Sequence, residues 1–280
     1  MRIKLLIVLF LLSCNTKNTD TSGSDNLNKK IDTALDENYR NTGQLIDSCI
    51  YISADYPKGL SDAYARKGLY FENQGIYDSA YTYYLKSLHI RKALGDKKLI
   101  AFAYTNLAET IVNFDQWDLT QKYLDSAWKL FHEVNDTSYL IKINQQYGKF
   151  FAELNNPKKA IPYFLKGLDY AKKKNDETDI AMFFQSLGNI YMAVSKYDSS
   201  FYYYYAWKKI IDTKHNYAEL YEYYSCISAL QMDVNKIDDA KVSIDSGLLA
   251  FQKAQLDSLE YLYLLARKHE LAGKTKDYKS

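Results

Sequence analysis

The sequence predicts an all-α fold, specifically an α-solenoid in which antiparallel helical hairpins are stacked one after another. Three observations support this prediction. Small residues recur every forty positions along most of the chain, and within each forty-residue stretch apolar residues recur at three- and four-residue intervals. Only 11 of the 280 residues are Gly and 3 are Pro. That is too little turn chemistry for a β-sandwich, a barrel or a doubly wound sheet.

The first thirteen residues have the composition of a secretory signal. Arg2 and Lys4 supply positive charge, and an unbroken apolar run follows from Leu5 to Leu12. Such a run spans about 12 Å as a helix, well short of the roughly 30 Å hydrocarbon core of a bilayer. We therefore expect residues 1–13 to be a signal peptide and not a membrane span.

The end of this segment, Leu11-Leu12-Ser13-Cys14, resembles the lipobox of bacterial lipoproteins. The resemblance implies that Cys14 is acylated, for example with palmitate, and becomes the new amino terminus. Several acyl chains anchor a protein stably where one does not. The alternative is an ordinary secretory signal with an incidental Cys. We expect residues 14–26 to be the lipidated Cys and a flexible tether, because they are polar and poor in apolar residues.

The implied location is the bacterial cell envelope, with the chain anchored by lipid and facing the periplasm. Asn15 is compatible with sorting to the outer membrane, which we favour over the inner one. The charge balance argues against a nucleic-acid partner. The chain has 36 basic and 34 acidic residues, and loss of Arg2 and Lys4 would make it neutral. A neutral chain lacks the basic footprint of a nucleic-acid-binding domain.

Residues 27–60 predict one N-terminal capping hairpin. Its apolar positions are Leu45, Ile46, Cys49 and Ile52, and Pro57 closes it. The segment lacks the small-residue signature of the units that follow, which is why we expect a cap.

The forty-residue period begins at Gly68 and runs through five registers without an insertion. In each register a small residue is followed twelve positions later by a second small residue, and sixteen positions later by a large one. The first small residues are Gly68, Ala108, Gly148, Gly188 and Ser228; the second are Ala80, Thr120, Ala160, Ser200 and Ala240; the large ones are Tyr84, Leu124, Phe164, Tyr204 and Ile244. We interpret each register as a helix crossing, where small residues let two backbones approach and the large residue fills the space beside them.

The helices of each hairpin are separated by polar breaks such as Asn73-Gln74-Gly75 and Asn155-Asn156-Pro157. Asp78, Asp198 and Asp238 open second helices, where a carboxylate favours the positive end of the helix dipole. The predicted units are 61–100, 101–140, 141–180, 181–220 and 221–260, which together cover 61–260. Residues 261–280 then form an incomplete sixth unit or a C-terminal cap.

Parts of the repeated units also resemble a known repeat family. The run Leu187-Gly188-Asn189-Ile190-Tyr191, followed by Tyr197 and then by residues 200–204, resembles a tetratricopeptide repeat (TPR). The usual unit has 34 residues, so this chain resembles the forty-residue subtype. The resemblance covers 61–260. It implies a right-handed superhelix whose first helices line a concave groove.

Catalytic chemistry has little support in the sequence. His89, His132, His215 and His269 are scattered over different units, without the i, i+4 spacing of a helical metal site. There is no Gly-rich phosphate loop and no nucleophile motif. We therefore expect no enzyme activity, no metal, no cofactor and no small-molecule substrate.

The remaining cysteines and the tyrosines are interpreted structurally. Cys49 and Cys226 belong to distant units, so we expect two free, buried thiols. Tyr supplies 28 of the 280 residues. We interpret Tyr83, Tyr123, Tyr163 and Tyr203, forty apart, as packing positions. The five consecutive aromatic residues 201–205 cannot all face the core, so one or two of them are expected on the surface as a possible adhesive patch.

The TPR resemblance implies a partner site on the exposed face of the first helices. Its predicted residues are Phe102, Asn106, Glu109, Asn113, Lys142, Gln145, Lys149, Met182, Gln185, Asn189 and Met192. The same pattern exposes Asp62, Ala65, Leu69, Glu72, Thr105, Gln146, Glu222, Ser225 and Met232. The amides carry donors and acceptors that suit the backbone of a bound peptide. Phe102, Met182 and Met192 suit its apolar side chains.

The sequence thus predicts a non-catalytic scaffold lipoprotein that binds a peptide or protein partner in its groove at the cell envelope. Two alternatives remain open. One is the sensory module of a membrane-linked helix-turn-helix transcriptional regulator. The other is a subunit of an outer-membrane assembly or secretion complex.

Overall fold

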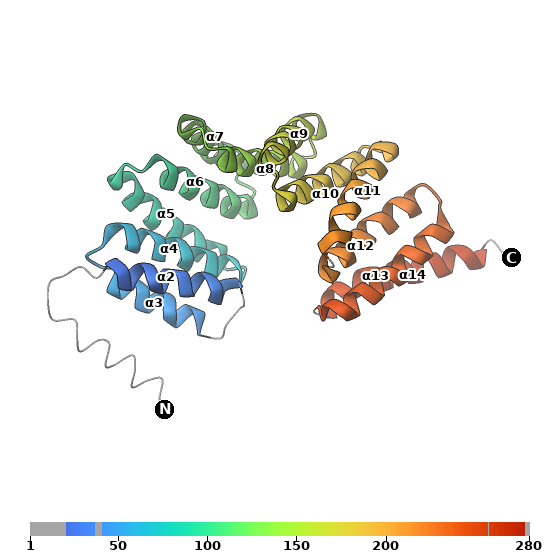
Figure 1. The fold of residues 1–280 in the computed structure, drawn as a ribbon, viewed down its shortest axis with the longest axis horizontal. Coiled ribbons are helices and arrows are strands. Elements are labelled where there is room, and N and C mark those ends of the chain that lie inside the picture. Colours follow the sequence, from blue (N-terminus) through green and yellow to red (C-terminus); the bar gives the residue numbers. More distant parts are fainter. Residues whose placement is uncertain (1–20, 37–40, 215, 257, 278–280) are drawn as a thin grey trace, which may run out of the picture. The chain divides into compact units, whose positions relative to one another are not determined.

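A computed structural model describes residues 21–36, 41–214, 216–256 and 258–277. Across these residues there are thirteen α-helices and one short 3-10 helix, with no β-strand (Figure 1). The chain forms two compact units, residues 1–134 and 135–280. In both, consecutive helices pack against each other as antiparallel hairpins. The predicted all-α fold of stacked hairpins is confirmed.

Six α-helices lie in the described part of unit 1, each packed on its neighbours in the chain. They are α2 (Thr21–Asp36), α3 (Thr42–Ile52), α4 (Pro57–Glu72), α5 (Tyr77–Leu94), α6 (Lys97–Ile111) and α7 (Trp117–Val134), with the 3-10 helix Val112–Phe114 between the last two. Helix α2 also contacts α4.

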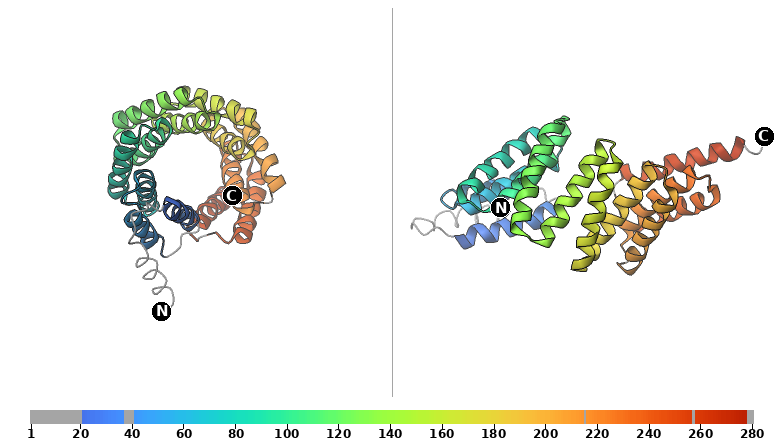
Figure 2. Two further views of the ribbon diagram at one scale, coloured as in Figure 1. Left: turned by 60° about the vertical axis from the view of Figure 1, so that its left-hand side comes forward. Right: turned by 90° about the horizontal axis from the view of Figure 1, so that it is seen from above.

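Seven helices in the same arrangement lie among the residues of unit 2 that the structure describes. They are α8 (Thr137–Glu153), α9 (Pro157–Lys174), α10 (Glu177–Ala193), α11 (Tyr197–Lys214), α12 (Tyr217–Asp233), α13 (Ile237–Ala254) and α14 (Ser258–Asp277). Helix α10 packs on α9 and α11 and also touches α8 and α12. The first helices of the hairpins therefore form one layer and the second helices form the other (Figure 2).

The helices from α4 to α13 begin at a regular interval of twenty residues. In the described part of the chain, nine of these helices are followed by a residue in the left-handed backbone region. These residues are Gly75, Gly95, Asp115, Asn135, Asn155, Asn175, Ser195, Asn235 and Gln255. A left-handed residue after the last turn lets the next amide satisfy the open carbonyls of the helix. The first helices begin at Pro57, Lys97, Thr137, Glu177 and Tyr217, four residues before each predicted unit.

A second repeated device starts the first helices. Asp96, Asp136, Asp176 and Asn216 lie forty residues apart, and each side chain accepts a hydrogen bond from a backbone N–H of the first turn. Such caps satisfy donors that the helix itself leaves open. This series of caps was not among the sequence-based predictions.

The predicted crossing of small and large residues is present within the hairpins. A Cβ added at Gly188 would lie 2.3 Å from the ring of Tyr204, and one added at Gly148 would lie 2.3 Å from that of Phe164. The second small residue also joins the two helices at the crossing. The hydroxyl of Ser200 donates to the carbonyl of Gly188 at 2.8 Å. In the hairpins that contain Gly68, Gly148 and Gly188, the first helix is thus held against an aromatic ring of its own second helix.

The expectation of a flexible tether is wrong for residues 21–26, which belong to helix α2. Polar side chains of this helix are buried against polar side chains of α3 and of the residue that follows it. The hydroxyls of Ser24 and Ser53 are 2.7 Å apart, and the thiol of Cys49 lies 3.3 Å from Oδ1 of Asn28. A low apolar content therefore did not mean an absence of packing. The capping hairpin begins at Thr21 and consists of α2 and α3.

Residues 1–20, with the predicted signal peptide and Cys14, lie outside the described residues. Within the described part, none of the helices combines the length and the hydropathy that crossing a bilayer requires.

Candidate partner-binding site

The predicted site residues of unit 2 lie on α8 and α10, and side chains of neighbouring first helices meet there. The amide nitrogen of Gln145 approaches the sulfur of Met182, and that of Gln185 donates to Oε2 of Glu222 at 3.1 Å. Both pairs join residues thirty-seven positions apart, so they repeat the same geometry from one hairpin to the next. We call this surface of α8, α10 and α12 the first-helix face of unit 2.

Asn189 is exposed on this face, and a hydrogen bond from the core fixes its orientation. Its Oδ1 accepts a 2.6 Å hydrogen bond from the hydroxyl of Tyr204, whose ring is completely buried. Because the carbonyl branch is held by the core, the NH₂ branch has a defined direction as a donor. A side chain fixed in this way loses little rotamer freedom when it binds a partner.

The other predicted residues of unit 2 differ in how much surface they offer. Lys149 is exposed and Lys142 is half-buried. Met192 packs on the edge of the cluster around Tyr204 and Trp207. Part of its side chain is therefore buried in the core.

In unit 1 more of the predicted residues already pack against, or hydrogen-bond to, other residues of the same unit. The ring of Phe102 packs edge-on against Phe131, with centroids 5.4 Å apart. The amide of Asn113 donates to the carbonyls of Glu109 and Thr110 at 3.2 Å, so it caps its own helix. Asn106 and Glu109 are half-buried. We find the more regular polar surface in unit 2.

Two residues expected on the exposed face are buried. Thr105 is completely inaccessible, and its hydroxyl bonds to the carbonyl of Ala101 at 3.0 Å. Gln146 is 8% exposed. The expectation was wrong because polar character was taken to mean exposure, whereas a threonine hydroxyl can be satisfied within its own helix.

A polar contact in unit 1 was not anticipated. The carboxylate of Glu72 accepts hydrogen bonds from the hydroxyls of Tyr84 at 2.8 Å and Thr110 at 3.1 Å, and so joins α4, α5 and α6. Burial and the neighbouring carboxylate raise the pKa of Tyr84 well above its usual value. The tyrosine stays neutral and donates, so the contact is structural.

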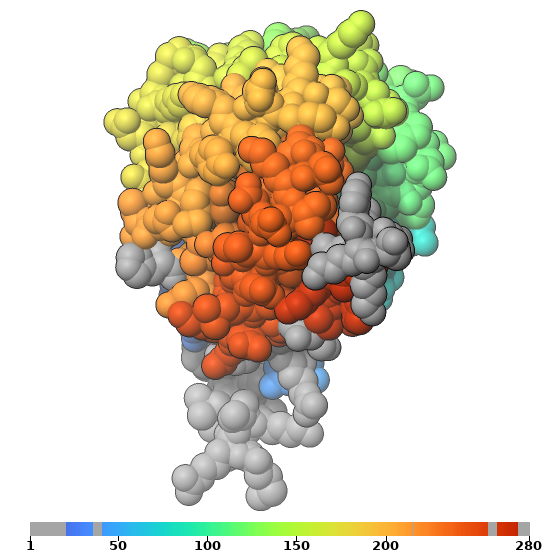
Figure 3. Space-filling view, turned by 90° about the vertical axis from the view of Figure 1, so that its right-hand side faces the viewer, coloured from blue at the N-terminus to red at the C-terminus, as the bar shows by residue number. Residues whose placement is uncertain are grey.

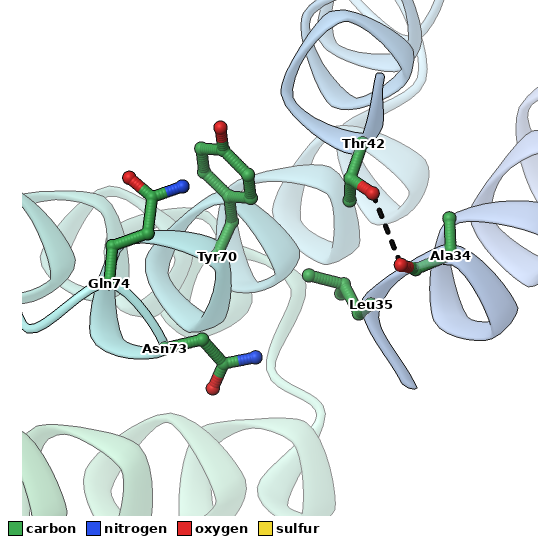
Figure 4. A pocket seen from close by; sticks show the side chains of 6 residues that line it. All are labelled: Ala34, Leu35, Thr42, Tyr70, Asn73 and Gln74. Carbon is green, nitrogen blue, oxygen red and sulfur yellow. Dashed lines mark hydrogen bonds between the residues drawn. The ribbon is translucent and has the colours of Figure 1, made fainter. Parts of the chain in front are cut away.

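Unit 1 also contains a small open pocket of about 280 Å³ among α2, α3 and α4. Its lining residues are Ala34, Leu35, Thr42, Tyr70, Asn73 and Gln74 (Figure 4). Thr42 bonds to the carbonyl of Ala34, while the side chains of Tyr70, Asn73 and Gln74 come from the end of α4 and the turn after it. Nothing in the sequence analysis pointed to this pocket.

Cys49 and Cys226 are free, as expected. Cys49 is buried, whereas Cys226 is only partly buried as a residue. Burial raises the pKa of the Cys226 thiol to about 11, although Arg267 opposes the shift. At neutral pH it is therefore a thiol and a poor nucleophile. Among the residues that the structure describes, no three His, Cys, Asp or Glu side chains are grouped so that they could hold a metal ion.

The repeated tyrosines pack as predicted. Tyr203 stacks on Tyr191 with ring centroids 5.5 Å apart, and Tyr163 stacks on Tyr147 at 4.8 Å. Of the five consecutive aromatic residues on α11, Tyr202 and Tyr205 are exposed by 65% and 50%. The expectation that one or two of them reach the surface is confirmed.

Comparison with known proteins gives a likeness in structure only. No protein-family model matches the chain, and no curated protein matches it in sequence. Solved structures do match. A Rap protein complexed with Competence and Sporulation Factor has a TM-score of 0.73 and 13% identity, over 92% of this chain and 72% of that one. NprR in complex with its cognate peptide NprX has a TM-score of 0.66 and 16% identity, over 99% and 82% of the two chains.

A third match names the repeat. A signal-transduction ATPase with numerous domains from Pyrococcus horikoshii, described as having a tetratricopeptide repeat sensor, has a TM-score of 0.68 and 16% identity. The match covers 94% of this chain and 40% of the archaeal one. The chain therefore has the fold of TPR-like helical repeat proteins.

Proposed function

We propose that this protein is a non-catalytic scaffold that binds an extended peptide segment on the first-helix face of unit 2. The observation that carries the proposal is a row of three amides, Gln145, Gln185 and Asn189. Gln145 lies on α8, and the other two lie on successive turns of α10. Amides both donate and accept, so they can match the alternating N–H and C=O groups of a peptide backbone. The complex of NprR with a peptide supports this use of the fold.

The modest polarity of the face suits a ligand recognised mainly through its backbone. Lys149 adds one exposed positive charge beside the amides, and Met182 adds an adaptable apolar contact. A preorganised surface of this kind binds with less ordering cost than a mobile one.

We further propose that the scaffold is held at the cell envelope through a lipid on Cys14. This part rests on the lipobox-like run of residues 11–14. Labelled palmitate should be incorporated by the wild-type chain in a bacterial host and lost in Cys14→Ala. Equal labelling of both chains would rule out the anchor.

The sensory alternative also has an observation in its favour. One of the matching structures is the apo form of a quorum sensor, NprR from B. thuringiensis, with a TM-score of 0.66 and 17% identity. In that case the peptide would be a signal, and its binding would change the affinity for a second partner. The same peptide-binding experiment serves both candidates, and a competition with the second partner separates them.

The test begins with peptides selected from a random displayed library on the full chain. Their affinities are then measured for the wild type and for Gln145→Ala/Gln185→Ala/Asn189→Ala. We expect a loss of about tenfold or more, since each peptide hydrogen bond contributes about 1 kcal/mol. Backbone N-methylation of the peptide should weaken binding more than scrambling of its side chains.

A matched control removes three exposed amides from other helices, Gln44→Ala/Gln121→Ala/Gln252→Ala. This control should bind like the wild type, and circular dichroism should show that both triple variants keep their helices. Equal affinities of the two triple variants would contradict the assignment of the site.

A further inference from the structure

The solvent side of helix α9 carries a concentration of positive charge, only part of which is paired within the fold. Six exposed lysines lie on this helix, with one acidic residue and no arginine. The lysines are Lys158, Lys159, Lys166, Lys172, Lys173 and Lys174. The acidic residue, Asp169, is paired with Lys173, and Lys174 is paired with Asp176 beyond the helix. Lys159 and Lys172 lie over the rings of Phe151 and Phe184. Among the described residues, this leaves Lys158 and Lys166 without an ion pair or a ring contact. The buried residues of α9 lie on the opposite side, against α8 and α10.

This charge is not a property of the repeat. The equivalent second helix α7 has Lys122 and Lys129 against three acidic residues, and α13 has Lys241 and Lys253 against three. The second helices α5 and α11 carry a smaller excess, of two and one positive charges, against five on α9. An excess of this size within a regular series points to a role outside the packing of the hairpins.

The next second helix adds exposed aromatic residues. Tyr202, Tyr205 and Lys209 are exposed on α11, away from its buried side at Tyr204 and Trp207. Leu165, 39% exposed, lies among the lysines of α9. The hairpins of unit 2 follow one another in chain order along the surface, as the yellow-to-red progression in Figure 3 shows. The second-helix layer of unit 2 thus presents lysines together with tyrosines and an aliphatic side chain.

We propose that the second-helix side of unit 2, centred on α9 and α11, rests on the headgroups of an anionic lipid bilayer. Lysine is depleted from the cores of protein–protein interfaces, where arginine is enriched. Recognition of nucleic-acid bases relies mainly on the bidentate fork of arginine, which α9 lacks. On a bilayer, by contrast, lysines act as point charges towards lipid phosphates and extend their chains along apolar surface.

The tyrosines fit the same partner, because a ring with a hydroxyl at its tip suits the boundary between headgroups and acyl chains. Such contact would leave the first-helix layer of unit 2 on the side away from the lipid. The inference does not depend on the proposed peptide site.

The experiment measures sedimentation with vesicles of phosphatidylcholine, with and without phosphatidylglycerol. The full chain carries Cys14→Ser, so that no acyl chain contributes. We expect binding that requires phosphatidylglycerol and weakens as salt is raised. Lys158→Ser/Lys166→Ser should reduce the phosphatidylglycerol-dependent affinity about 25-fold, because each lysine near an anionic surface contributes about fivefold.

The matched control Lys122→Ser/Lys129→Ser removes the same charge from the exposed side of α7 and should stay within twofold of the parent chain. Tyr202→Ser/Tyr205→Ser should weaken binding at low and high salt alike. The proposal fails if phosphatidylglycerol adds no binding, or if both lysine pairs reduce it equally. It also fails if the α9 variant binds vesicles normally but loses an acidic protein partner.

Discussion

The hydroxyl of Tyr204 reaches from the core of unit 2 to its first-helix face and donates a 2.6 Å hydrogen bond to Asn189. The ring of the same tyrosine lies against Gly188, the residue preceding Asn189. One side chain therefore sets both the closeness of α10 and α11 and the orientation of a predicted binding residue. Packing and recognition are coupled at this position.

Replacement of Gly188 by Ala should destabilise the protein although Ala is the better helix former. A new Cβ would lie 2.3 Å from the buried ring of Tyr204, so the helices must separate or the ring must move. Overpacking of this kind costs about 1–3 kcal/mol, which exceeds the gain of about 1 kcal/mol in helix propensity. Urea unfolding measures the difference. Gly273→Ala in α14 is the control, because nothing lies within 4 Å of its Cβ position and the change should be neutral or stabilising.

Tyr204→Phe should lower the affinity for the selected peptides more than it lowers stability. The change removes the hydrogen bond that orients Asn189, while the ring that fills the core remains. We expect a stability loss of about 1 kcal/mol and a several-fold loss of affinity. Calorimetric titration and urea unfolding give the two values. Tyr84→Phe removes the equivalent hydroxyl in unit 1, and if it weakens peptide binding equally, the coupling through Asn189 is refuted.

The crossing residues show how much of this fold could be predicted from sequence. Gly188, Ser200 and Tyr204 keep a fixed spacing because the backbones meet at one point in every hairpin, and a fixed spacing is visible in a sequence. The left-handed helix ends were harder to recognise, because Ser195 and Gln255 occupy a conformation that usually favours Gly or Asn. Their period of twenty emerges only when the whole series is aligned.

The candidate site was less predictable, because it depends on contacts between hairpins. Gln145 and Met182 are thirty-seven residues apart, and only the stacking of α8 on α10 brings them together. Thr105 shows the opposite error, since a polar residue at a first-helix position is completely buried. Repeat periodicity identifies equivalent positions, but it does not say which of them face solvent when the side chain is both small and polar.

Asp176 makes part of the stability dependent on pH. Hydrogen bonding from the backbone N–H of Asp179, together with Lys174, holds the pKa of this carboxyl below its usual value. Since the folded pKa is lowered, the contribution is present above the unfolded pKa of about 4 and is lost as the pH falls through the folded value. Asp176→Ala should cost about 1 kcal/mol at pH 7 and much less in acid. Unfolding in urea at both pH values tests this, and a loss that is independent of pH would contradict it.

Removing one partner from the ion pair of Arg91 with Asp62 should strongly destabilise the protein. Replacing both partners should cost little. Arg91 is 5% exposed and donates to Asp62 at 3.0 Å and to the carbonyl of Leu99 at 3.1 Å. Asp62→Ala leaves a buried charge without its partner, which costs about 3–5 kcal/mol.

The other repeats indicate how that loss can be recovered. The positions equivalent to Arg91, forty residues apart, are all apolar: Phe131, Ala171 and Ile211 are completely buried and Phe251 is half-buried. Arg91→Leu added to Asp62→Ala should therefore restore most of the stability, since an apolar side chain at this position needs no partner. Thermal unfolding of the two single variants and the double variant forms a complete cycle. If the double variant is no more stable than Asp62→Ala alone, then Arg91 is required for more than neutralising Asp62, and its hydrogen bond to Leu99 becomes the dominant contact.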